Sequence, residues 1–162
     1  MATEGLRVIR MRPFNHTGPG QSAAFAVPAF ARQIARIEAG QQPPVLSVGA
    51  LGAWRDFLDV PDVCAAYAET LARADALPPG AILNLASGQA RQIGDILADL
   101  LRLSGVKAEI RSDSGRVRGN EIAVAAGDAA LARRMLDWSP RIAWKQTLRD
   151  VIDDWRERIL TA

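Results

Sequence analysis

The sequence contains few of the side chains from which metal sites and nucleophilic active sites are built. Among 162 residues there is one cysteine, Cys64, and one histidine, His16. A single cysteine excludes an internal disulfide framework, and one cysteine far from one histidine does not reach the ligand count of a zinc site. A Ser-His-Asp triad would have to use His16, but the chain has no G-x-S-x-G motif, so hydrolytic catalysis is disfavoured. The place of Cys64 within a predicted helix indicates a small buried residue rather than a nucleophile.

Long apolar segments are also lacking. No run approaches the ~20 residues that cross a bilayer. Residues 1–6, Met-Ala-Thr-Glu-Gly-Leu, have no basic start followed by an apolar stretch. A membrane partner and a secretory signal are therefore not expected, and a cytoplasmic location is the simplest interpretation.

Neither sign of charge dominates. Twenty Lys and Arg oppose eighteen Asp and Glu, so the formal net charge is +2, with a pI near 9.2. The charges are interleaved, without a basic stripe or tail, so a nucleic-acid partner is not expected. All basic residues except Lys107 and Lys145 are arginine. Together with the abundant alanine, the preference for arginine over lysine reflects genome composition rather than a binding surface.

The glycine-rich turn of a dinucleotide-binding fold is absent as well. Gly18 and Gly20 have the spacing of the first two glycines in G-x-G-x-x-G, but Ala23 stands where the third is needed. Pro19 lies between them, and no strand-turn-helix pattern surrounds the segment. We therefore expect no cofactor to bind this chain alone.

Short apolar runs alternate with amphipathic patterns, which predicts an α/β fold in a single domain spanning residues 1–162. Strands are predicted over residues 6–12, 45–48, 55–58, 81–85 and 107–110. Helices are predicted over residues 25–39, 59–73, 92–103, 128–136 and 147–159. The second, fourth and fifth of these begin at residues that can cap a helix: Asp59, Asp128 and Thr147. Residues 15–21 are dense in turn formers and are predicted to be a loop.

Four polar residues could serve a ligand that carries a diphosphate, which needs fixed hydrogen-bond donors. Asn15 follows the first predicted strand at its carboxyl end, where ligands bind in open α/β sheets, although the residues alone favour an asparagine that only closes its own turn. Arg55 begins a strand, and a surface arginine is the alternative. Arg118 and Glu121 lie three apart and could bind phosphate and sugar hydroxyls, or form an ordinary ion pair.

Two further groups of residues have structural interpretations. Three aspartates recur at intervals of three, and helix capping explains them better than metal binding: Asp56, Asp59 and Asp62. Three tryptophans punctuate the last third of the chain, and we interpret them as packing anchors: Trp138, Trp144 and Trp155.

Five segments carry a resemblance to a known family. They are Arg-Pro-Phe-Asn-His-Thr-Gly-Pro-Gly-Gln at 12–21, Arg-Asp-Phe-Leu-Asp-Val at 55–60, Asn-Leu-Ala-Ser-Gly at 84–88, Arg118-x-x-Glu121 with Gly127-Asp128, and Asp-Trp-Ser-Pro at 137–140. In this order and spacing they resemble the carboxyl-terminal part of extended short-chain dehydrogenases/reductases that act on nucleotide-diphosphate sugars. Among these enzymes the chain is most similar to GDP-6-deoxy-4-keto-mannose reductases.

The resemblance implies a fold and a set of roles. The chain would be the substrate-binding part of such an enzyme without its amino-terminal dinucleotide-binding Rossmann core, and residues 6–14 would be a late strand of that sheet. Asn15 would contact the substrate diphosphate, Arg55 and Arg118 would clamp it, and Glu121 would bind ribose hydroxyls. The backbone of residues 46–48, Val48 included, would face the base. Pro13 and Phe14 would lie beside the nicotinamide of NAD or NADP in the intact enzyme.

The sequence also departs from the family pattern. Gly119 stands where relatives usually have proline, and Ala50 where asparagine is common. The family's chemistry uses a Tyr-x-x-x-Lys pair, in which tyrosine is the general acid/base. Tyr67 is the only tyrosine here, and Leu71 stands where the lysine would be. The resemblance therefore implies substrate contacts without the catalytic pair.

Three hypotheses follow for the function. The first is the substrate-binding part of an NAD(P)-dependent sugar-nucleotide reductase, epimerase or dehydratase that is not catalytic alone and takes a nucleotide-diphosphate sugar as its partner. The second is a binding or regulatory module that pairs with a paralogue, a second copy or a separate amino-terminal half, because its first strand would expose an edge. The third is a remnant whose ligand residues have lost their geometry.

Overall fold

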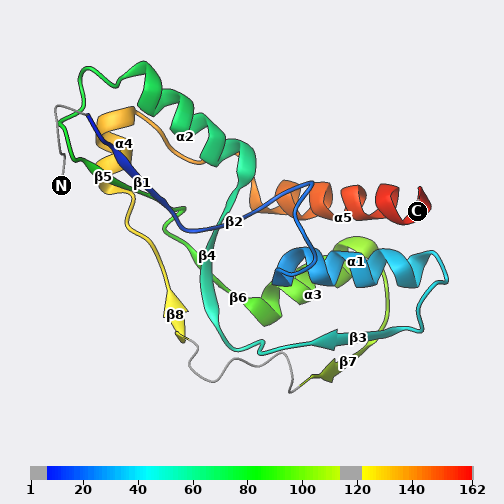
Figure 1. The fold of residues 1–162 in the computed structure, drawn as a ribbon. Helices are drawn as coiled ribbons and strands as arrows, with labels where there is room; N and C mark the ends of the chain where they lie inside the picture. Colours follow the sequence, from blue (N-terminus) through cyan, green and yellow to red (C-terminus); the bar gives the residue numbers. More distant parts are fainter. Residues whose placement is uncertain (1–6, 114–121, 162) are drawn as a thin grey trace.

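In the computed structural model, residues 7–113 and 122–161 are described (Figure 1). The predicted ligand residues Arg118 and Glu121 lie outside these ranges. In chain order the elements are β1 (Arg10–Pro13), β2 (Asn15–Thr17), α1 (Ala26–Glu38), β3 (Val45–Val48), β4 (Trp54–Asp59), α2 (Val60–Ala72), β5 (Ile82–Leu85), β6 (Ala90–Gln92), α3 (Ile93–Ser104), β7 (Glu109–Ser112), β8 (Val124–Ala125), α4 (Ala130–Leu136) and α5 (Trp144–Leu160).

The strands form three small sheets, and most of their pairs are parallel. β1 pairs with β5, and β3 pairs with β7. β4 is the central strand of the third sheet: it pairs in parallel with β2 and β8 and antiparallel with β6. Helices connect the parallel strands, as such crossovers require. The mixed α/β architecture confirms the predicted fold class.

Two hydrophobic clusters lie on either side of β4, one built on β3, α1, α3 and α5, the other on β5, α2 and α4 (Figure 1). Neighbouring residues of β4 serve different clusters, because side chains alternate along a strand. Phe57 belongs to the first and Leu58 to the second. β4 therefore runs along the seam between the two clusters.

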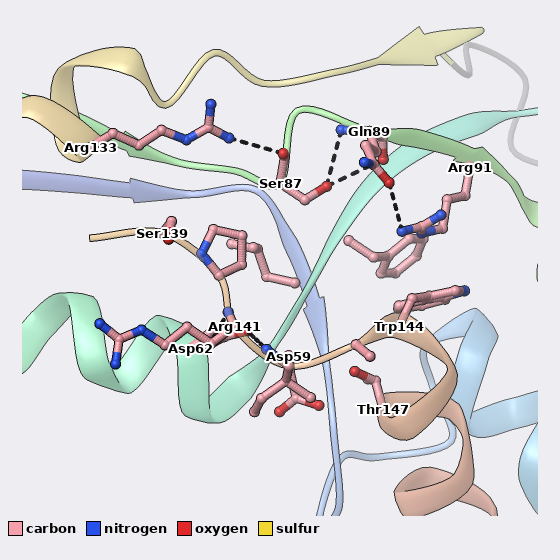
Figure 2. Close-up of a pocket in the computed structure, with 15 residues that line it drawn as sticks. Asp59, Asp62, Ser87, Gln89, Arg91, Arg133, Ser139, Arg141, Trp144 and Thr147 are labelled. Atoms are coloured by element: carbon pink, nitrogen blue, oxygen red, sulfur yellow. Dashed lines mark hydrogen bonds between the residues drawn. The ribbon is translucent and has the colours of Figure 1, made fainter. Parts of the chain in front are cut away.

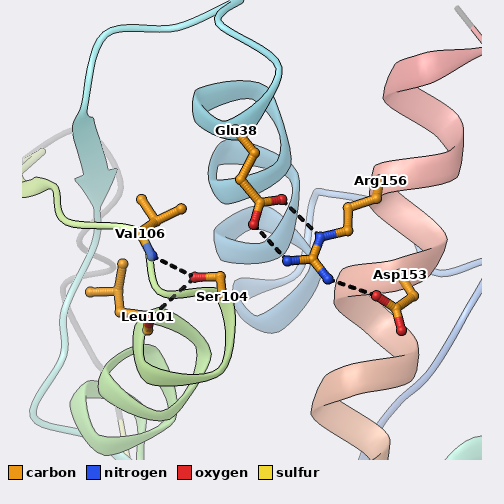
Figure 3. Close-up of polar contacts among 6 residues, drawn as sticks. All are labelled: Glu38, Leu101, Ser104, Val106, Asp153 and Arg156. Atoms are coloured by element: carbon orange, nitrogen blue, oxygen red, sulfur yellow. Dashed lines mark hydrogen bonds and ion pairs between the residues drawn. The ribbon is translucent and has the colours of Figure 1, made fainter.

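The first cluster is held together by polar contacts at its rim (Figure 3). Arg156 on α5 binds both carboxylate oxygens of Glu38 on α1, at 2.8 and 2.6 Å, and the pKa of Arg156 is raised mainly by this contact. At the end of α3, the Ser104 hydroxyl donates to the Leu101 carbonyl and accepts from the Val106 N–H. Gly105 follows with a left-handed φ of 73°, which glycine adopts without strain.

Several short elements differ from the predictions. Residues 15–17 were predicted as loop but form β2, because Asn15 to Thr17 pair with Phe57 to Asp59. This is a tertiary contact that local turn propensity does not reveal. β6 and β8 were not predicted either. α5 begins at Trp144 rather than Thr147, and Thr147 is buried inside the helix instead of capping it.

Two further interpretations need correction, and one is supported. Cys64 lies in α2 as predicted, but it is exposed rather than buried, because it faces away from the cluster that Val63 and Ala66 enter. Asp59 occupies the N-cap position of α2 without a capping hydrogen bond. Trp138 is a packing anchor: it is buried in the second cluster and its indole N–H donates to the Asp62 carbonyl at 2.9 Å.

The described residues contain no helix with the length and apolar character to cross a membrane. Within the same residues, no group of three or more His, Cys, Asp or Glu side chains could hold a metal ion.

Candidate functional site

The side chain of Asp56 is the polar centre of the β4 sheet. It is completely buried, and its carboxylate accepts hydrogen bonds from four donors in two loops. One oxygen accepts from the N–H and the hydroxyl of Ser87, at 2.9 and 2.6 Å. The other accepts from the N–H groups of Gly88 and Gly127, at 2.8 and 3.2 Å. The capping interpretation of Asp56 is therefore wrong: this carboxylate ties distant loops to β4.

The loop after β8 is packed tightly against Phe14 at Gly127. A β-carbon built at Gly127 would lie 2.3 Å from the β-carbon of Ala86 and 2.8 Å from the Phe14 ring. The Phe14 N–H donates to the Leu85 carbonyl at 2.9 Å. The backbone of Phe14 is thus tied to β5 and its ring lies against Gly127, one residue beyond Pro13, the last residue of β1.

Asn15 opens β2 directly after Phe14. Its backbone is paired in register with Phe57, and its side chain is exposed. No hydrogen bond of this side chain falls within residues 7–113 and 122–161, so the alternative in which Asn15 closes its own turn is not supported there. The amide remains available at the point where the predicted ligand would lie.

Arg55 lies on β4, two residues before the partner of Asn15. Its Nη1 donates to the Trp54 carbonyl at 2.8 Å and to the Ile122 carbonyl at 2.6 Å. Ile122 is the residue that follows Glu121 in the chain. Arg118 and Glu121 lie outside the described residues, so their place relative to Arg55 stays a prediction.

Val48 lies apart from these residues, at the end of β3. Its side chain is buried in the first cluster, and its carbonyl accepts from the Asp113 N–H at 2.8 Å. A contact between the backbone at residues 46–48 and a nucleotide base stays a prediction.

A cavity of about 430 Å³ lies at the seam between the two clusters (Figure 2). The five described residues to which the sequence assigned a ligand or cofactor contact do not line it: Pro13, Phe14, Asn15, Val48 and Arg55. Its charged lining residues come from five parts of the chain. They are Asp59 at the end of β4, Asp62 at the start of α2, Arg91 on β6, Arg133 on α4 and Arg141 in the segment before α5. Sequence reasoning missed the three arginines, and no local motif marks them.

Both aspartates of this cavity are engaged by the wall itself. The oxygens of Asp62 accept from the N–H groups of Arg141 and Ile142, at 2.9 and 3.1 Å, so Asp62 ties α2 to the segment before α5. Asp59 lies near the Thr147 hydroxyl. Burial raises the pKa of Asp59, with a contribution from the charges of Asp62 and Asp150 and partial compensation by the Thr147 hydroxyl.

Arg91 forms the opposite wall together with Trp144. Its guanidinium lies 5.1 Å from the centre of the Trp144 ring, which in turn lies 5.6 Å from the Phe57 ring. One nitrogen of Arg91 donates to the Gln89 side chain at 3.2 Å, while its buried Nε has no hydrogen-bond partner among the described residues. Burial lowers the pKa of Arg91, and the charges of Asp56 and Asp99 offset part of this effect.

Comparisons with known proteins agree on one family. The profile of the GDP-mannose 4,6 dehydratase family matches residues 1–151. The GDP-6-deoxy-D-mannose reductase of Pseudomonas aeruginosa is 41% identical over 157 residues, covering 97% of this chain and 51% of that protein. A dTDP-6-deoxy-L-talose 4-dehydrogenase (NAD(P)(+)) of Kitasatospora kifunensis is 29% identical over 142 residues, covering 87% and 44%.

Solved structures show the same relationship. The chain is similar to RMD from Pseudomonas aeruginosa complexed with NADPH, with a TM-score of 0.88, 40% identity, and coverage of 96% of this chain and 50% of that one. It is also similar to a UDP-glucose 4-epimerase from Stenotrophomonas maltophila with bound NAD and formylated UDP-arabinopyranose, with a TM-score of 0.81, 27% identity, and coverage of 98% and 50%. The chain spans about half the length of the curated relatives it matches.

The packing at Gly127 predicts the effect of one added methyl group. Gly127→Ala should lower the free energy of unfolding by about 1–3 kcal/mol, because the methyl group would overlap Ala86 and the Phe14 ring. Urea unfolding measures this change. Gly52→Ala is the matched control, since nothing lies within 4 Å of its built β-carbon. Equal effects of the two substitutions would contradict the described packing of Phe14.

The raised pKa of Asp59 predicts how stability changes with pH. A carboxyl whose pKa is higher in the folded state stabilises the fold below its unfolded pKa, and this contribution is lost as the pH rises through the folded pKa. Asp59→Asn cannot ionise, so the variant should gain stability relative to the parent between about pH 4 and pH 7. Urea unfolding at both pH values, with the exposed Asp95→Asn as control, checks this. A difference that stays constant with pH would contradict it.

Proposed function

Because the chain belongs to the GDP-mannose 4,6-dehydratase family, we propose that it is the nucleotide-diphosphate-sugar-binding part of an NAD(P)-dependent sugar-nucleotide enzyme. Its similarity to a GDP-6-deoxy-D-mannose reductase favours a reductase of GDP-4-keto-6-deoxy-mannose over an epimerase or a dehydratase. The single observation that carries the proposal is the β2–β4 pairing, which brings Asn15 next to the strand that holds Arg55.

The proposed contacts follow from the donors at this point. The exposed Asn15 amide would donate to a phosphate oxygen, and Arg55 would add a guanidinium to the same diphosphate. Arg118 would complete the clamp and Glu121 would bind ribose hydroxyls. The Arg55–Ile122 hydrogen bond supports this grouping, because Ile122 follows Glu121 in the chain. Val48 would face the base from β3.

The cofactor would meet this chain only at Pro13 and Phe14. The ring of Phe14 lies against Gly127, so it would offer an apolar surface of fixed position to the face of a nicotinamide. When bound, the nicotinamide would exchange a hydride with the sugar carbonyl carbon. Tyr67 does not supply the general acid: it is exposed on α2, and Leu71 lies one turn further along the helix. This chain would bind and orient substrate without catalysing the reaction alone.

Binding can be tested with GDP-mannose. A ligand that binds only the native state should raise stability by about 2.7 kcal/mol at roughly 100 times its dissociation constant. Thermal unfolding with excess GDP-mannose should therefore show a higher midpoint, and Arg55→Ala should remove most of the shift. Arg102→Ala, on the exposed face of α3, is the control. A cooperative transition without any shift would contradict the proposal.

Turnover provides a separate test of the non-catalytic part of the proposal. The purified chain should show no NAD(P)H-dependent reduction of GDP-4-keto-6-deoxy-mannose, because Tyr67 lacks the lysine partner that lowers a catalytic tyrosine's pKa. NAD(P)H absorbance measures this directly. Steady oxidation of NAD(P)H that depends on the sugar nucleotide would overturn it, whatever the binding result.

A second function is favoured by the outer edge of β1. Within the described residues β1 pairs only with β5, so its other edge is open. A groove that includes residues of both β1 and β5 is lined by four apolar or aromatic residues and two arginines: Ile9, Arg10, Met11, Arg12, Tyr67 and Ile82, of which Tyr67 and Ile82 are exposed. Open strand edges with apolar neighbours favour pairing with another chain. The alternative function is a non-catalytic binding or regulatory module that pairs through this edge with a paralogue, a second copy or a separate amino-terminal half.

Sedimentation of the purified chain tests the second-copy form of this alternative. Self-association through the edge should be weakened by Ile82→Lys, which replaces an exposed apolar side chain with a third positive charge beside Arg10 and Arg12. Leu160→Lys, at the exposed end of α5, should leave it unchanged. A chain that stays monomeric at high concentration would count against pairing with a second copy.

A further inference from the structure

The side chain of Gln21 fastens the strand that carries Asn15. Its Oε1 accepts a hydrogen bond from the Thr17 hydroxyl at 2.8 Å, and its Nε2 donates to the His16 carbonyl at 3.1 Å. Thr17 is completely buried, and a buried hydroxyl needs such a partner. One side chain therefore holds the last two residues of β2.

A second contact holds the chain on the other side of Asn15. The Nδ1 atom of His16 lies 3.0 Å from the Phe14 carbonyl oxygen, to which the ring donates when this nitrogen carries the proton. The carbonyls of Phe14 and His16, on either side of Asn15, are thus each held by a side chain. Within residues 7–113 and 122–161, β2 pairs only with β4. A short strand with one partner has few ladder bonds of its own, so these side-chain contacts fix its course.

Gln21 is in turn held by α5. The Asp154 carboxylate accepts the Gly20 N–H at 3.1 Å and forms an ion pair with Arg158, also at 3.1 Å. Arg158 donates to the Gln21 carbonyl at 3.5 Å. Gly20 has a φ of 86°, a left-handed conformation that glycine adopts without strain. The turn between β2 and α1 is therefore anchored on α5, and Gln21 reaches β2 from a fixed position.

We propose that Gln21 is a positioning residue that holds β2 so that the Asn15 amide meets a substrate phosphate. The inference rests on the proposed function, in which Asn15 donates to the diphosphate. Both the oxygen and the nitrogen of the Gln21 amide already bond within the protein, so Gln21 acts through Asn15 rather than on the ligand. A donor that occupies the binding position only part of the time lowers the apparent affinity by that fraction.

A double-substitution cycle tests this role, with GDP-mannose binding measured by calorimetric titration of the purified chain. Gln21→Met keeps the length of the side chain and removes both hydrogen bonds. If β2 then presents Asn15 about one tenth of the time, the dissociation constant rises about tenfold. Asn15→Ala should weaken binding to a similar extent. The double variant should bind no more weakly than Asn15→Ala alone, because Gln21 then has nothing left to position.

A purely structural role of Gln21 predicts a different result. Two independent losses multiply, so the double variant would bind about a hundredfold more weakly than the parent. That outcome would overturn the proposal, as would unchanged binding by Gln21→Met. Gln41→Met, at an exposed position after α1, is the matched control and should bind like the parent.

A second variant guards against a folding defect in Gln21→Met. Asp154→Ala loosens the turn from α5 but keeps the Gln21 side chain, and alanine suits a helix. Its loss of affinity should likewise disappear in the Asn15→Ala background. Thermal unfolding verifies that each variant is folded.

Hydrogen exchange in the free chain separates this inference from the proposed function. The backbone amides of β2 should exchange faster in Gln21→Met than in the parent or in Gln41→Met, because the strand opens more often. If the parent does not bind GDP-mannose, the proposed function fails, and exchange still decides whether Gln21 holds β2. Unchanged exchange would overturn the role of Gln21 even when the parent binds GDP-mannose.

Discussion

A fully buried carboxylate on β4 is the constraint on which the rest of the structure depends. Asp56 has no contact with water, so its charge is tolerated only because four donors converge on it. Those donors belong to the loop after β5 and to the loop after β8. The folded chain must therefore close both loops onto β4. One of them carries Gly127, which in turn fixes the ring of Phe14.

Asp59 and Asp62, three and six positions after Asp56, also lie where distant parts of the chain meet. Asp62 joins α2 to the segment before α5, and Asp59 lies at the end of β4 next to Thr147 on α5. Together the three carboxylates hold two hydrophobic clusters together across β4. The polar seam that results leaves a cavity on one flank, while the β2–β4 pairing presents Asn15 beside β4. The proposed nucleotide-sugar site and the seam cavity thus both lie beside β4.

The sequence predicted the elements whose signal is local. The helices around 25–39, 59–73 and 92–103 and the strand at 45–48 were found with small shifts, because each repeats its apolar pattern over its own length. β2, β6 and β8 were missed because strands of two or three residues depend on their partners. The aspartates were misread for a related reason. Capping is a local explanation, whereas the partners of Asp56 lie 31 to 71 residues away.

The candidate site was predicted in the same uneven way. Asn15, Phe14 and Arg55 were singled out through motifs, and their ligand roles stay predictions; the structure adds that Asn15 pairs with Phe57, two residues after Arg55 on β4. The arginines of the seam cavity were invisible because they come from three separate elements and no spacing links them.

The central claim is that the nucleotide diphosphate binds where β2 meets β4. Amide chemical shifts recorded by NMR while GDP-mannose is added test this residue by residue. The account predicts the largest changes at Phe14, Asn15 and Arg55 and along residues 122–127, with little change around Arg133 and Arg141. Saturable binding that leaves those amides unmoved would contradict the account, because the ligand would then lie elsewhere on the chain.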